Sequence, residues 1–203
     1  MTPFYSGDPV ARTLMELVLL LWLGSELWHG LGVMARTVRE GRGIGRSGQD
    51  RLSGPVLIAG IGLAVGLGIR AAVFVPEAAI RNFRPEIFGL GLALALAGIA
   101  FRWYAIARLG RFFNTRVTVT ADQVVVDTGP YRLVRHPSYS GVLLTLFGVL
   151  LASTNWLSLA CFLLALPGMA YRISVEEKAL ATGLGQPYRD YMRRTKRVIP
   201  YVL

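Results

Sequence analysis

A short polar segment, residues 129–141, carries the residue types best suited to chemistry in this chain. It contains two arginines, one histidine and two tyrosines, and an apolar run follows it directly. Proline fixes its own φ and restrains the residue before it, so Pro137 should hold His136 extended at the start of a helix. Arg135 and His136, beside free helix N–H groups, could bind an anion such as a carboxylate. For this segment alone, a purely structural role is the alternative.

A second polar group, formed by Arg172, Glu176 and Glu177, ends the last apolar run. Arg172 and Glu176 are four residues apart and would share a helix face, where a surface ion pair is the simplest interpretation. The order argues against that interpretation, because pairs with the acid first are more favourable. Two adjacent glutamates just beyond a membrane span are costly if buried without a cationic partner. A ligand with sulfonium and ammonium groups, such as S-adenosylmethionine, would supply one.

Five apolar runs must position these polar groups. The chain is 53% hydrophobic and 17% charged, whereas a soluble domain carries about 25% charged residues. Long apolar runs are typical of bilayer-spanning helices. We therefore predict an all-α fold, an integral membrane helical bundle of about five transmembrane helices, at residues 12–35, 54–75, 87–109, 139–152 and 156–171. The last two are short and lie close together in the sequence, so they should form a tight antiparallel hairpin.

The basic residues predict the orientation of the bundle. A net charge of +10 would suggest nucleic-acid binding in a soluble protein, but here the charge lies between apolar runs, so topology is the simpler explanation. Seventeen of the 22 basic residues fall on one side of the five-helix arrangement, four on the other, and Arg102 lies inside the third helix. Because cytoplasmic loops are positive, the N-terminus should be outside and the C-terminus cytoplasmic. We expect a prokaryotic inner (cytoplasmic) membrane protein, with membrane lipid and no nucleic acid as a partner.

We expect a single membrane domain over residues 1–203, with three spans in 1–109 and a catalytic region in 110–203. Within the latter, residues 117–120 and 124–126 are short β-prone runs. Residues 173–197 predict a short helix, a break at 183–187 and a basic amphipathic C-terminal helix that could also lie on anionic lipid. These segments would form a cytoplasmic cofactor-binding region.

Other polar or small residues suggest packing rather than a site. The single cysteine, Cys161, excludes a disulfide framework or a cysteine metal site within one chain. Glu26 and His29 lie one helical turn apart, and a buried polar pair is a simpler expectation than a metal site, because no third ligand type is nearby. Gly62 and Gly66 form a small-xxx-small pair expected to pack against another helix. The N-terminus lacks a signal-peptide pattern, so the first apolar run should stay in the protein.

Several motifs follow one another in the second half of the chain. They are Gly129-Pro130-Tyr131, Arg135-His136-Pro137-Ser138-Tyr139-Ser140-Gly141, Glu176-Glu177-Lys178-Ala179-Leu180, Gly185-Gln186-Pro187-Tyr188-Arg189-Asp190-Tyr191 and Pro200. Their order resembles the isoprenylcysteine carboxyl methyltransferase family, which is related to the phosphatidylethanolamine N-methyltransferases. The resemblance covers roughly residues 110–203. Several blocks in order are more specific than any one block.

The resemblance implies that S-adenosyl-L-methionine binds between the two cytoplasmic segments. The cofactor-binding residues that it implies are Gln123, Val124, Val125, Val126, Tyr131, His136, Pro137, Ser138, Tyr139 and Glu176. It also implies that Arg172 faces the acceptor and acts as the catalytic residue. No metal site is implied.

The resemblance further implies methyl transfer to a lipophilic acceptor, such as a lipophilic small molecule or a prenylated substrate. A carboxylate is already anionic at neutral pH, so catalysis would consist mainly of alignment, with Arg172 as a clamp. An amine acceptor would first have to lose a proton to a base. Prenylated protein C-termini, free lipid acids, phospholipid amines and lipophilic thiols or phenols all stay open as acceptors, as does the oligomeric state.

Two other functions are the alternatives. Sterol-reductase-like membrane oxidoreductases, which use NADPH, carry a similar Arg-His-x-Tyr segment before a helical hairpin. The Glu-Glu block followed by Gly-x-x-Tyr-x-x-Tyr favours the methyltransferase. A non-enzymatic adaptor or lipid-binding membrane protein would have no cofactor affinity and would tolerate changes at His136.

Overall fold

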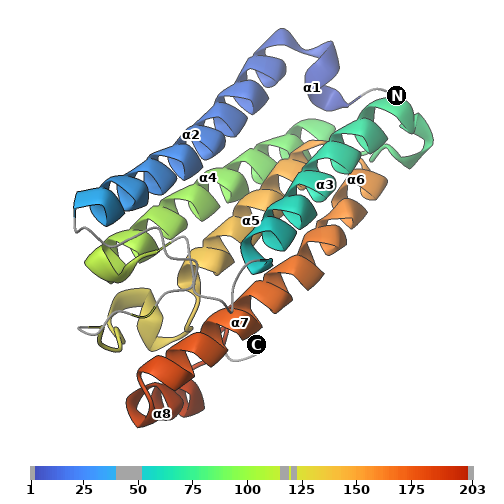
Figure 1. The fold of residues 1–203 in the computed structure, drawn as a ribbon. Helices are drawn as coiled ribbons and strands as arrows, with labels where there is room; N and C mark the ends of the chain where they lie inside the picture. Colours follow the sequence, from blue (N-terminus) through green and yellow to red (C-terminus); the bar gives the residue numbers. More distant parts are fainter. Residues whose placement is uncertain (1–2, 40–51, 115–118, 120–122, 201–203) are drawn as a thin grey trace.

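A computed structural model describes residues 3–39, 52–114, 119 and 123–200 as a bundle of long helices (Figure 1). The α-helices are α1 (Phe4–Gly7), α2 (Pro9–Arg39), α3 (Ser53–Phe74), α4 (Arg84–Leu109), α5 (Pro137–Ala152), α6 (Trp156–Ala160), α7 (Leu166–Gly183) and α8 (Gln186–Arg194). Short 3-10 helices are η1 (Pro76–Ala78), η2 (Gly110–Phe112), η3 (Gly129–Arg132) and η4 (Cys161–Ala165). The predicted all-α class is confirmed.

The described residues contain isolated β-bridges but no strand. The β-prone run 124–126 is therefore irregular backbone rather than a strand. Most of the other β-prone run, 117–120, lies outside the described residues, where only Val119 has a described position. At 124–126 the described part of the chain offers no neighbouring strand that could complete a ladder.

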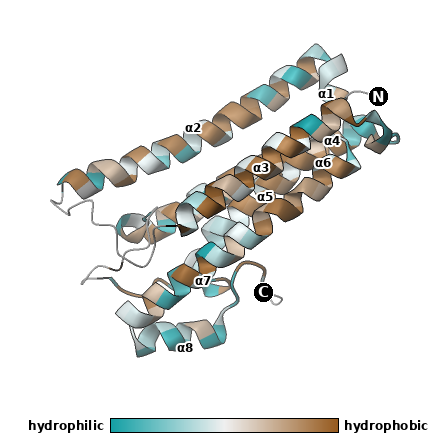
Figure 2. Ribbon diagram, turned by 45° about the vertical axis from the view of Figure 1, so that its right-hand side comes forward, coloured by the Kyte–Doolittle hydropathy of each residue, from teal (hydrophilic) through white to brown (hydrophobic). Residues whose placement is uncertain are grey.

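Four of the apolar helical stretches are long enough to cross a membrane. They are Pro9–Arg36, Ser53–Phe74, Arg84–Phe112 and Trp156–Gly183. The fifth, α5, has 16 residues, fewer than the roughly 20 that a span needs. It is enclosed by the other helices, and Leu146, Val149 and Leu150 have no exposed surface. Hydrophobic residues run along the bundle helices, whereas α8 is mainly hydrophilic (Figure 2). The chain is thus an integral membrane protein.

The last span is longer than predicted. The apolar pattern predicts a helix over 156–171, whereas α6, η4 and α7 form one run over Trp156–Gly183. Charge begins at Arg172 and ends the apolar pattern, but the Glu, Lys, Ala and Leu residues that follow are strong helix formers. The predicted break at 183–187 is confirmed, because α7 ends there and Gly185 has a φ of 66°. Glu176 and Glu177 therefore project from an ordered helix that continues a membrane span.

Glycines bring α4 and α5 into close contact. A Cβ on Gly98 would lie 2.5 Å from the backbone nitrogen of Thr145, and one on Gly91 would lie 2.5 Å from that of Ala152. On α5, a Cβ on Gly141 would lie 2.7 Å from the Cβ of Arg102. Small residues allow helix backbones to approach closely within a membrane. This contact places the first turns of α5 beside the carboxyl half of α4.

The glycines of α3 divide between two helix faces. Gly68 packs against Ser158, and Gly60 packs against the backbone of Leu164. Gly62 and Gly66 have no described atom within 4 Å of the position that a Cβ would take. The prediction that Gly62 and Gly66 pack against another helix is therefore wrong for the described chain. Two residues along a helix correspond to a rotation of about 200°, so Gly60 and Gly62 face different sides.

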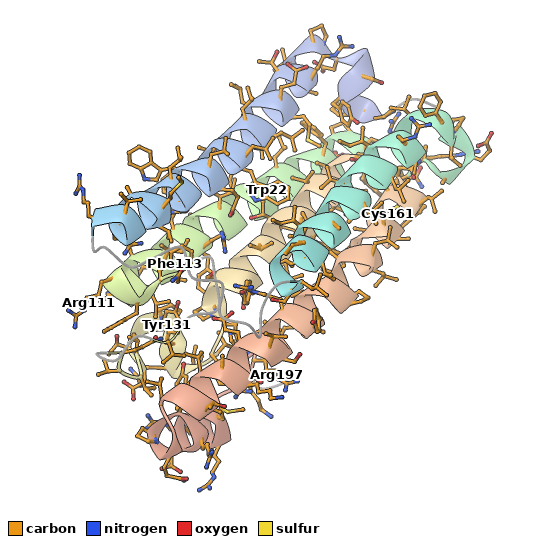
Figure 3. All side chains as sticks on the ribbon, viewed as in Figure 1. Trp22, Arg111, Phe113, Tyr131, Cys161 and Arg197 are labelled. Atoms are coloured by element: carbon orange, nitrogen blue, oxygen red, sulfur yellow. The ribbon has the colours of Figure 1, made fainter. Side chains whose placement is uncertain are left out.

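The polar elements gather at one end of the bundle (Figure 1). The carboxyl ends of α2, α4 and α7 meet the amino ends of α3 and α5 there, together with η3 and α8. At this end, Arg36 of α2 donates to the Gly110 carbonyl at 3.1 Å. Phe113 and Tyr131 also lie there, and Cys161 lies toward the opposite end (Figure 3). The basic residues that the sequence assigns to one side, where they are described, flank these elements.

Candidate active site

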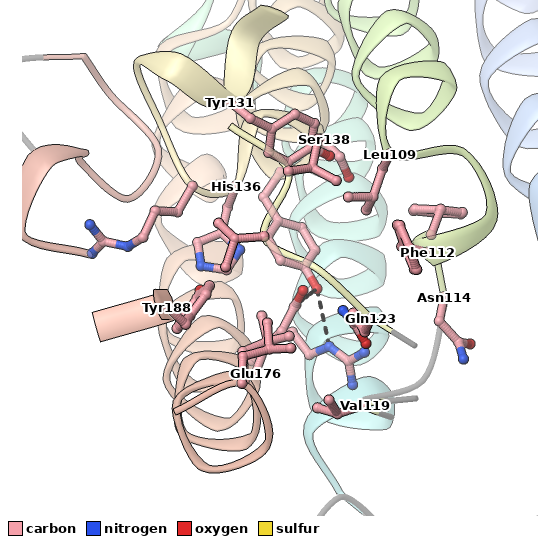
Figure 4. Close-up of a pocket in the computed structure, with 18 of the residues that line it drawn as sticks. Leu109, Phe112, Asn114, Val119, Gln123, Tyr131, His136, Ser138, Glu176 and Tyr188 are labelled. Atoms are coloured by element: carbon pink, nitrogen blue, oxygen red, sulfur yellow. Dashed lines mark hydrogen bonds between the residues drawn. The ribbon is translucent and has the colours of Figure 1, made fainter. Parts of the chain in front are cut away.

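A pocket of about 250 Å³ opens at the polar end of the bundle. Its wall combines the start of α3, the end of α4, residues 123–126, the segment from η3 into α5, and the polar half of α7. All but one of the eleven residues predicted from the sequence line it, namely Gln123, Val124, Val125, Val126, Tyr131, His136, Ser138, Tyr139, Arg172 and Glu176. Tyr131, His136 and Glu176 surround the cavity in Figure 4. Segments far apart in the sequence thus meet at one place.

Pro137 is the one predicted residue that does not line the pocket. It is buried at the first turn of α5. Its ring needs no N–H partner there, because the first helical N–H groups have no intrahelical acceptor. The residue before it, His136, has a φ of −125° and ψ of 55°, outside the helical region as proline requires. Pro137 therefore sets where α5 begins rather than forming part of the cavity surface.

Tyr139 connects the two charged residues of α7 that face the pocket. Its hydroxyl donates to Glu176 Oε2 at 2.7 Å and accepts from Arg172 Nε at 3.1 Å. Arg172 is buried and also donates to Ser53 Oγ at 2.9 Å, which ties α7 to the start of α3. Arg172 and Glu176 therefore meet through a phenol on α5, in place of the surface ion pair that their spacing alone would suggest. The arrangement brings a guanidinium and a carboxylate to one hydroxyl.

Glu177 belongs to a separate buried cluster behind the pocket. Its Oε1 pairs with Arg135 Nε at 2.8 Å and lies 3.4 Å from His136 Nε2. Its Oε2 pairs with Arg197 Nη2 at 3.0 Å. The sequence did not single out this role for Glu177 or Arg197, because no local spacing links the residues just before α5 with α7 and the tail. The one signal available was the cost of a second buried glutamate, which requires a cationic partner.

The residues after α8 lie along the segment that precedes α5. The amide of Arg135 donates to the Lys196 carbonyl at 2.7 Å, and that of His136 donates to the Arg197 carbonyl at 2.9 Å. In the other direction, the amide of Lys196 donates to the Leu133 carbonyl at 3.2 Å. Backbone pairing of this kind satisfies groups that no helix satisfies here. The tail therefore holds Arg135 and His136, two of the three residues that contact Glu177.

Two tyrosines of α8 pack into the site. Tyr188 and Tyr191 are buried and line the pocket. Burial raises the pKa of the Tyr191 phenol, so it stays protonated and donates to the Tyr131 carbonyl at 2.7 Å. The basic residues of the same helix, Arg189, Arg193 and Arg194, are exposed. The amphipathic helix predicted for the lipid surface therefore also completes the site with its buried face.

The polar residues of α2 have partners other than those expected. Glu26 forms an ion pair with Arg102 of α4, at 2.6 Å between Oε1 and Nε. His29 packs edge-on against the rings of Trp103 and Phe113, each with centroids 6.1 Å away. The predicted pairing of Glu26 with His29 is therefore wrong. Residues one turn apart share a face, but the neighbouring helix decides which partner each one meets.

Comparison with known proteins relates this chain to membrane methyltransferases. Residues 91–182 match the model of the isoprenylcysteine carboxyl methyltransferase (ICMT) family. A probable protein-S-isoprenylcysteine O-methyltransferase of Oryza sativa subsp. indica is 31% identical over 116 residues, which cover 56% of this chain and 61% of the rice protein. The Bacillus subtilis (strain 168) protein YpbQ is 28% identical over 108 residues, 52% of this chain and 64% of that protein. The matched regions thus span less than two-thirds of these relatives.

The fold is similar to a solved structure as well. The eukaryotic intramembrane Ras methyltransferase ICMT superposes with a TM-score of 0.54 at 21% identity, over 91% of this chain and 68% of that one. At this identity the similarity concerns the fold. The resemblance predicted from the sequence is therefore confirmed, and through residues 91–182 this chain is related to the isoprenylcysteine carboxyl methyltransferase family.

Proposed function

We propose that this pocket binds S-adenosylmethionine and that the protein transfers a methyl group to the carboxylate of a lipophilic acceptor. The observation that carries the proposal is the pairing of Glu176 and Arg172 through the Tyr139 hydroxyl. It places a carboxylate, which can pair with a positive charge, beside a guanidinium, which can pair with a negative charge, in one cavity. These are the two charges that a cationic cofactor and an anionic acceptor would bring.

The pocket chemistry fits the cofactor. Among the described residues, Glu176 has the Tyr139 phenol as its hydrogen-bond partner and no basic side chain at ion-pairing distance. Charge-assisted hydrogen bonds to a carboxylate are stronger than neutral ones. Residues 123–126 contribute non-helical backbone to the wall, whose polar groups are not used in a helix. S-adenosylmethionine, when bound, supplies an electrophilic methyl group; Glu176, Tyr131, His136, Ser138, Tyr139 and residues 123–126 would hold it.

Arg172 would orient the acceptor. It lies one helical turn nearer the apolar part of the last span than Glu176. The apolar residues Leu57 and Ile58 of α3 line the same pocket. A lipophilic acceptor could lie along that wall with its carboxylate at the guanidinium. Since a carboxylate needs no deprotonation, the residues would act by alignment and by excluding water. The isoprenylcysteine substrates in the relatives' names are acceptors of this kind.

We further propose that the polar end faces the cytoplasm, as the distribution of basic residues predicts. Asn82 and Arg193 are exposed at opposite ends of the bundle. In a Cys161→Ser background, a membrane-impermeant maleimide applied to intact cells should label Asn82→Cys and leave Arg193→Cys unlabelled. The reverse pattern would invert the orientation.

The methyl-transfer proposal is tested on the purified full chain in detergent. Calorimetry should show saturable binding of S-adenosylhomocysteine. Labelled S-adenosylmethionine should then methylate a synthetic farnesylated cysteine but leave the same compound unlabelled once its carboxylate is blocked as a methyl ester. Equal labelling of a phospholipid amine would redirect the proposal to N-methylation. Binding of NADPH without S-adenosylhomocysteine would overturn it.

A further inference from the structure

An ion pair between α2 and α4 lies against the pocket without a part in the chemistry above. Arg102 binds Glu26 with two nitrogens, Nε to Oε1 at 2.6 Å and Nη2 to Oε2 at 2.7 Å. Its third nitrogen, Nη1, donates to Ser138 Oγ at 2.8 Å and to the Ser138 carbonyl at 3.3 Å. Arg102 and Ser138 both line the pocket. One guanidinium therefore connects α2 to the first turn of α5.

A charged pair at this position is costly if it serves packing alone. Glu26 and Arg102 lie within two of the apolar stretches that are able to span a membrane. Ionisable residues there are expensive to bury, and apolar side chains of similar size usually stabilise a protein as well or better. The planar guanidinium of Arg102 instead binds the carboxylate through two nitrogens in one geometry, and this pairing fixes the orientation of the Arg102 side chain. The remaining N–H group is then aimed at Ser138.

The same face of α2 contacts the pocket wall a second time. Glu26 and His29 are three residues apart, and His29 and Arg36 are seven residues apart. This spacing places all three on one helix face. His29 packs against the Phe113 ring, and Arg36 donates to the Phe113 carbonyl at 3.4 Å. Phe113 lines the pocket. One face of α2 therefore supports the wall at both Ser138 and Phe113.

We infer that Glu26 and Arg102 are positioning residues of the pocket. Glu26 orients the guanidinium of Arg102, which in turn holds Ser138 and the first turn of α5 where the cofactor binds. The inference has two halves. The ligand half, that the cofactor binds beside Ser138, rests on the proposed function. The positioning half, that Glu26 and Arg102 hold Ser138 and the first turn of α5 in place, does not. Under this inference α2 contributes to the site by positioning its residues, although α2 precedes the residues that match the family model.

Hydrogen–deuterium exchange on the ligand-free protein tests the positioning half. Glu26→Gln should raise exchange in peptides covering residues 131–141, because Arg102 loses the carboxylate that orients it. Glu16→Gln is the matched control, since Glu16 is an exposed glutamate of the same helix. Exchange in 131–141 that stays at the wild-type level in Glu26→Gln would overturn the inference.

The double variant Glu26→Leu/Arg102→Leu separates positioning from folding. It removes both charges, so no unpaired charge stays buried and the melting temperature should stay near that of the wild type. S-adenosylhomocysteine should nevertheless bind about tenfold more weakly, the loss typical when a residue that orients a binding group is removed. Arg102→Lys, which keeps the charge but cannot fork, should show a smaller loss.

The outcomes keep the two proposals apart. Wild-type affinity in the double variant would overturn the inference and leave the proposed function standing. If the wild-type protein itself fails to bind S-adenosylhomocysteine, the proposed function fails, and the exchange experiment alone decides whether Glu26 and Arg102 position the segment.

Discussion

Glu176 and Glu177 are adjacent in the sequence, but their carboxylates lie in different environments. Glu176 faces the pocket and accepts a hydrogen bond from the Tyr139 hydroxyl. Glu177 is 4% exposed and pairs with Arg135 and Arg197. A helix turns by about 100° per residue, so neighbouring side chains reach different surroundings. The same helix turn thus has a pocket side and a support side.

Charge balance is what separates the two sides. The protein itself supplies the cations that neutralise Glu177, which is how a buried carboxylate is normally tolerated. Glu176 has no such partner among the described residues, which leaves its carboxylate available to the cationic cofactor of the proposed function. Adjacent residues of one type can therefore serve folding and binding separately. Four substitutions test this difference between the two glutamates.

Glu177→Gln should have the largest effect, and it should act on stability. Removing the buried carboxylate leaves Arg135 uncompensated, which should cost about 3 kcal/mol, near the lower end of the usual range because Arg197 is half exposed. Thermal unfolding in detergent would measure the loss. Asp190→Asn is the control, because the pair of Asp190 with Arg193 is exposed and its removal should leave the melting temperature unchanged. Equal melting of both variants would mean that the cluster is not structural.

Arg172→Lys should mainly reduce turnover. Lysine keeps the positive charge but cannot reproduce the planar fork that would hold the acceptor carboxylate. Methyl transfer to the farnesylated acceptor should fall about a hundredfold, as when a preorganised donor is removed from a reacting anion. Affinity for S-adenosylhomocysteine should stay close to that of the wild type. A parallel loss of cofactor affinity would show that Arg172 belongs to the cofactor side of the pocket.

Glu176→Gln should weaken cofactor binding and leave folding intact. A charge-assisted hydrogen bond contributes about 1.5–3 kcal/mol, so S-adenosylhomocysteine should bind about 10–100-fold more weakly. Calorimetry measures the affinity, and the melting temperature provides the check. The comparison with Glu177 breaks down if this variant melts early and binds normally.

Tyr139→Phe should have the smallest effect and should touch both functions. The hydroxyl joins Arg172 to Glu176, and a neutral hydrogen bond contributes about 1 kcal/mol, so affinity and turnover should each fall by about fivefold. Tyr171→Phe, at an exposed position on α7, is the matched control. A loss confined to turnover would indicate that Tyr139 acts through Arg172 alone.

Much of the pocket could be predicted because motif order carries information across the chain. Ten of the eleven predicted residues line one cavity, although Gln123 and Glu176 are far apart in the sequence. The exception, Pro137, belongs to the motif for its backbone restriction and not for its surface. Motif matching does not distinguish a residue that shapes the backbone from one that lines the pocket.

The membrane class, the helical bundle, the break before α8 and the grouping of basic residues were all predictable from the sequence, because hydrophobic runs, helix formers and turn residues act locally. It also identified the segments that form the pocket. Three features became visible only in the folded chain: Glu26 pairs with Arg102, Gly60 and Gly68 pack against other helices while Gly62 and Gly66 do not, and Glu177 rather than Glu176 lies in the buried ion-pair cluster. Each of these depends on how a helix is rotated against its neighbours, and that rotation is set by packing between residues distant in the sequence.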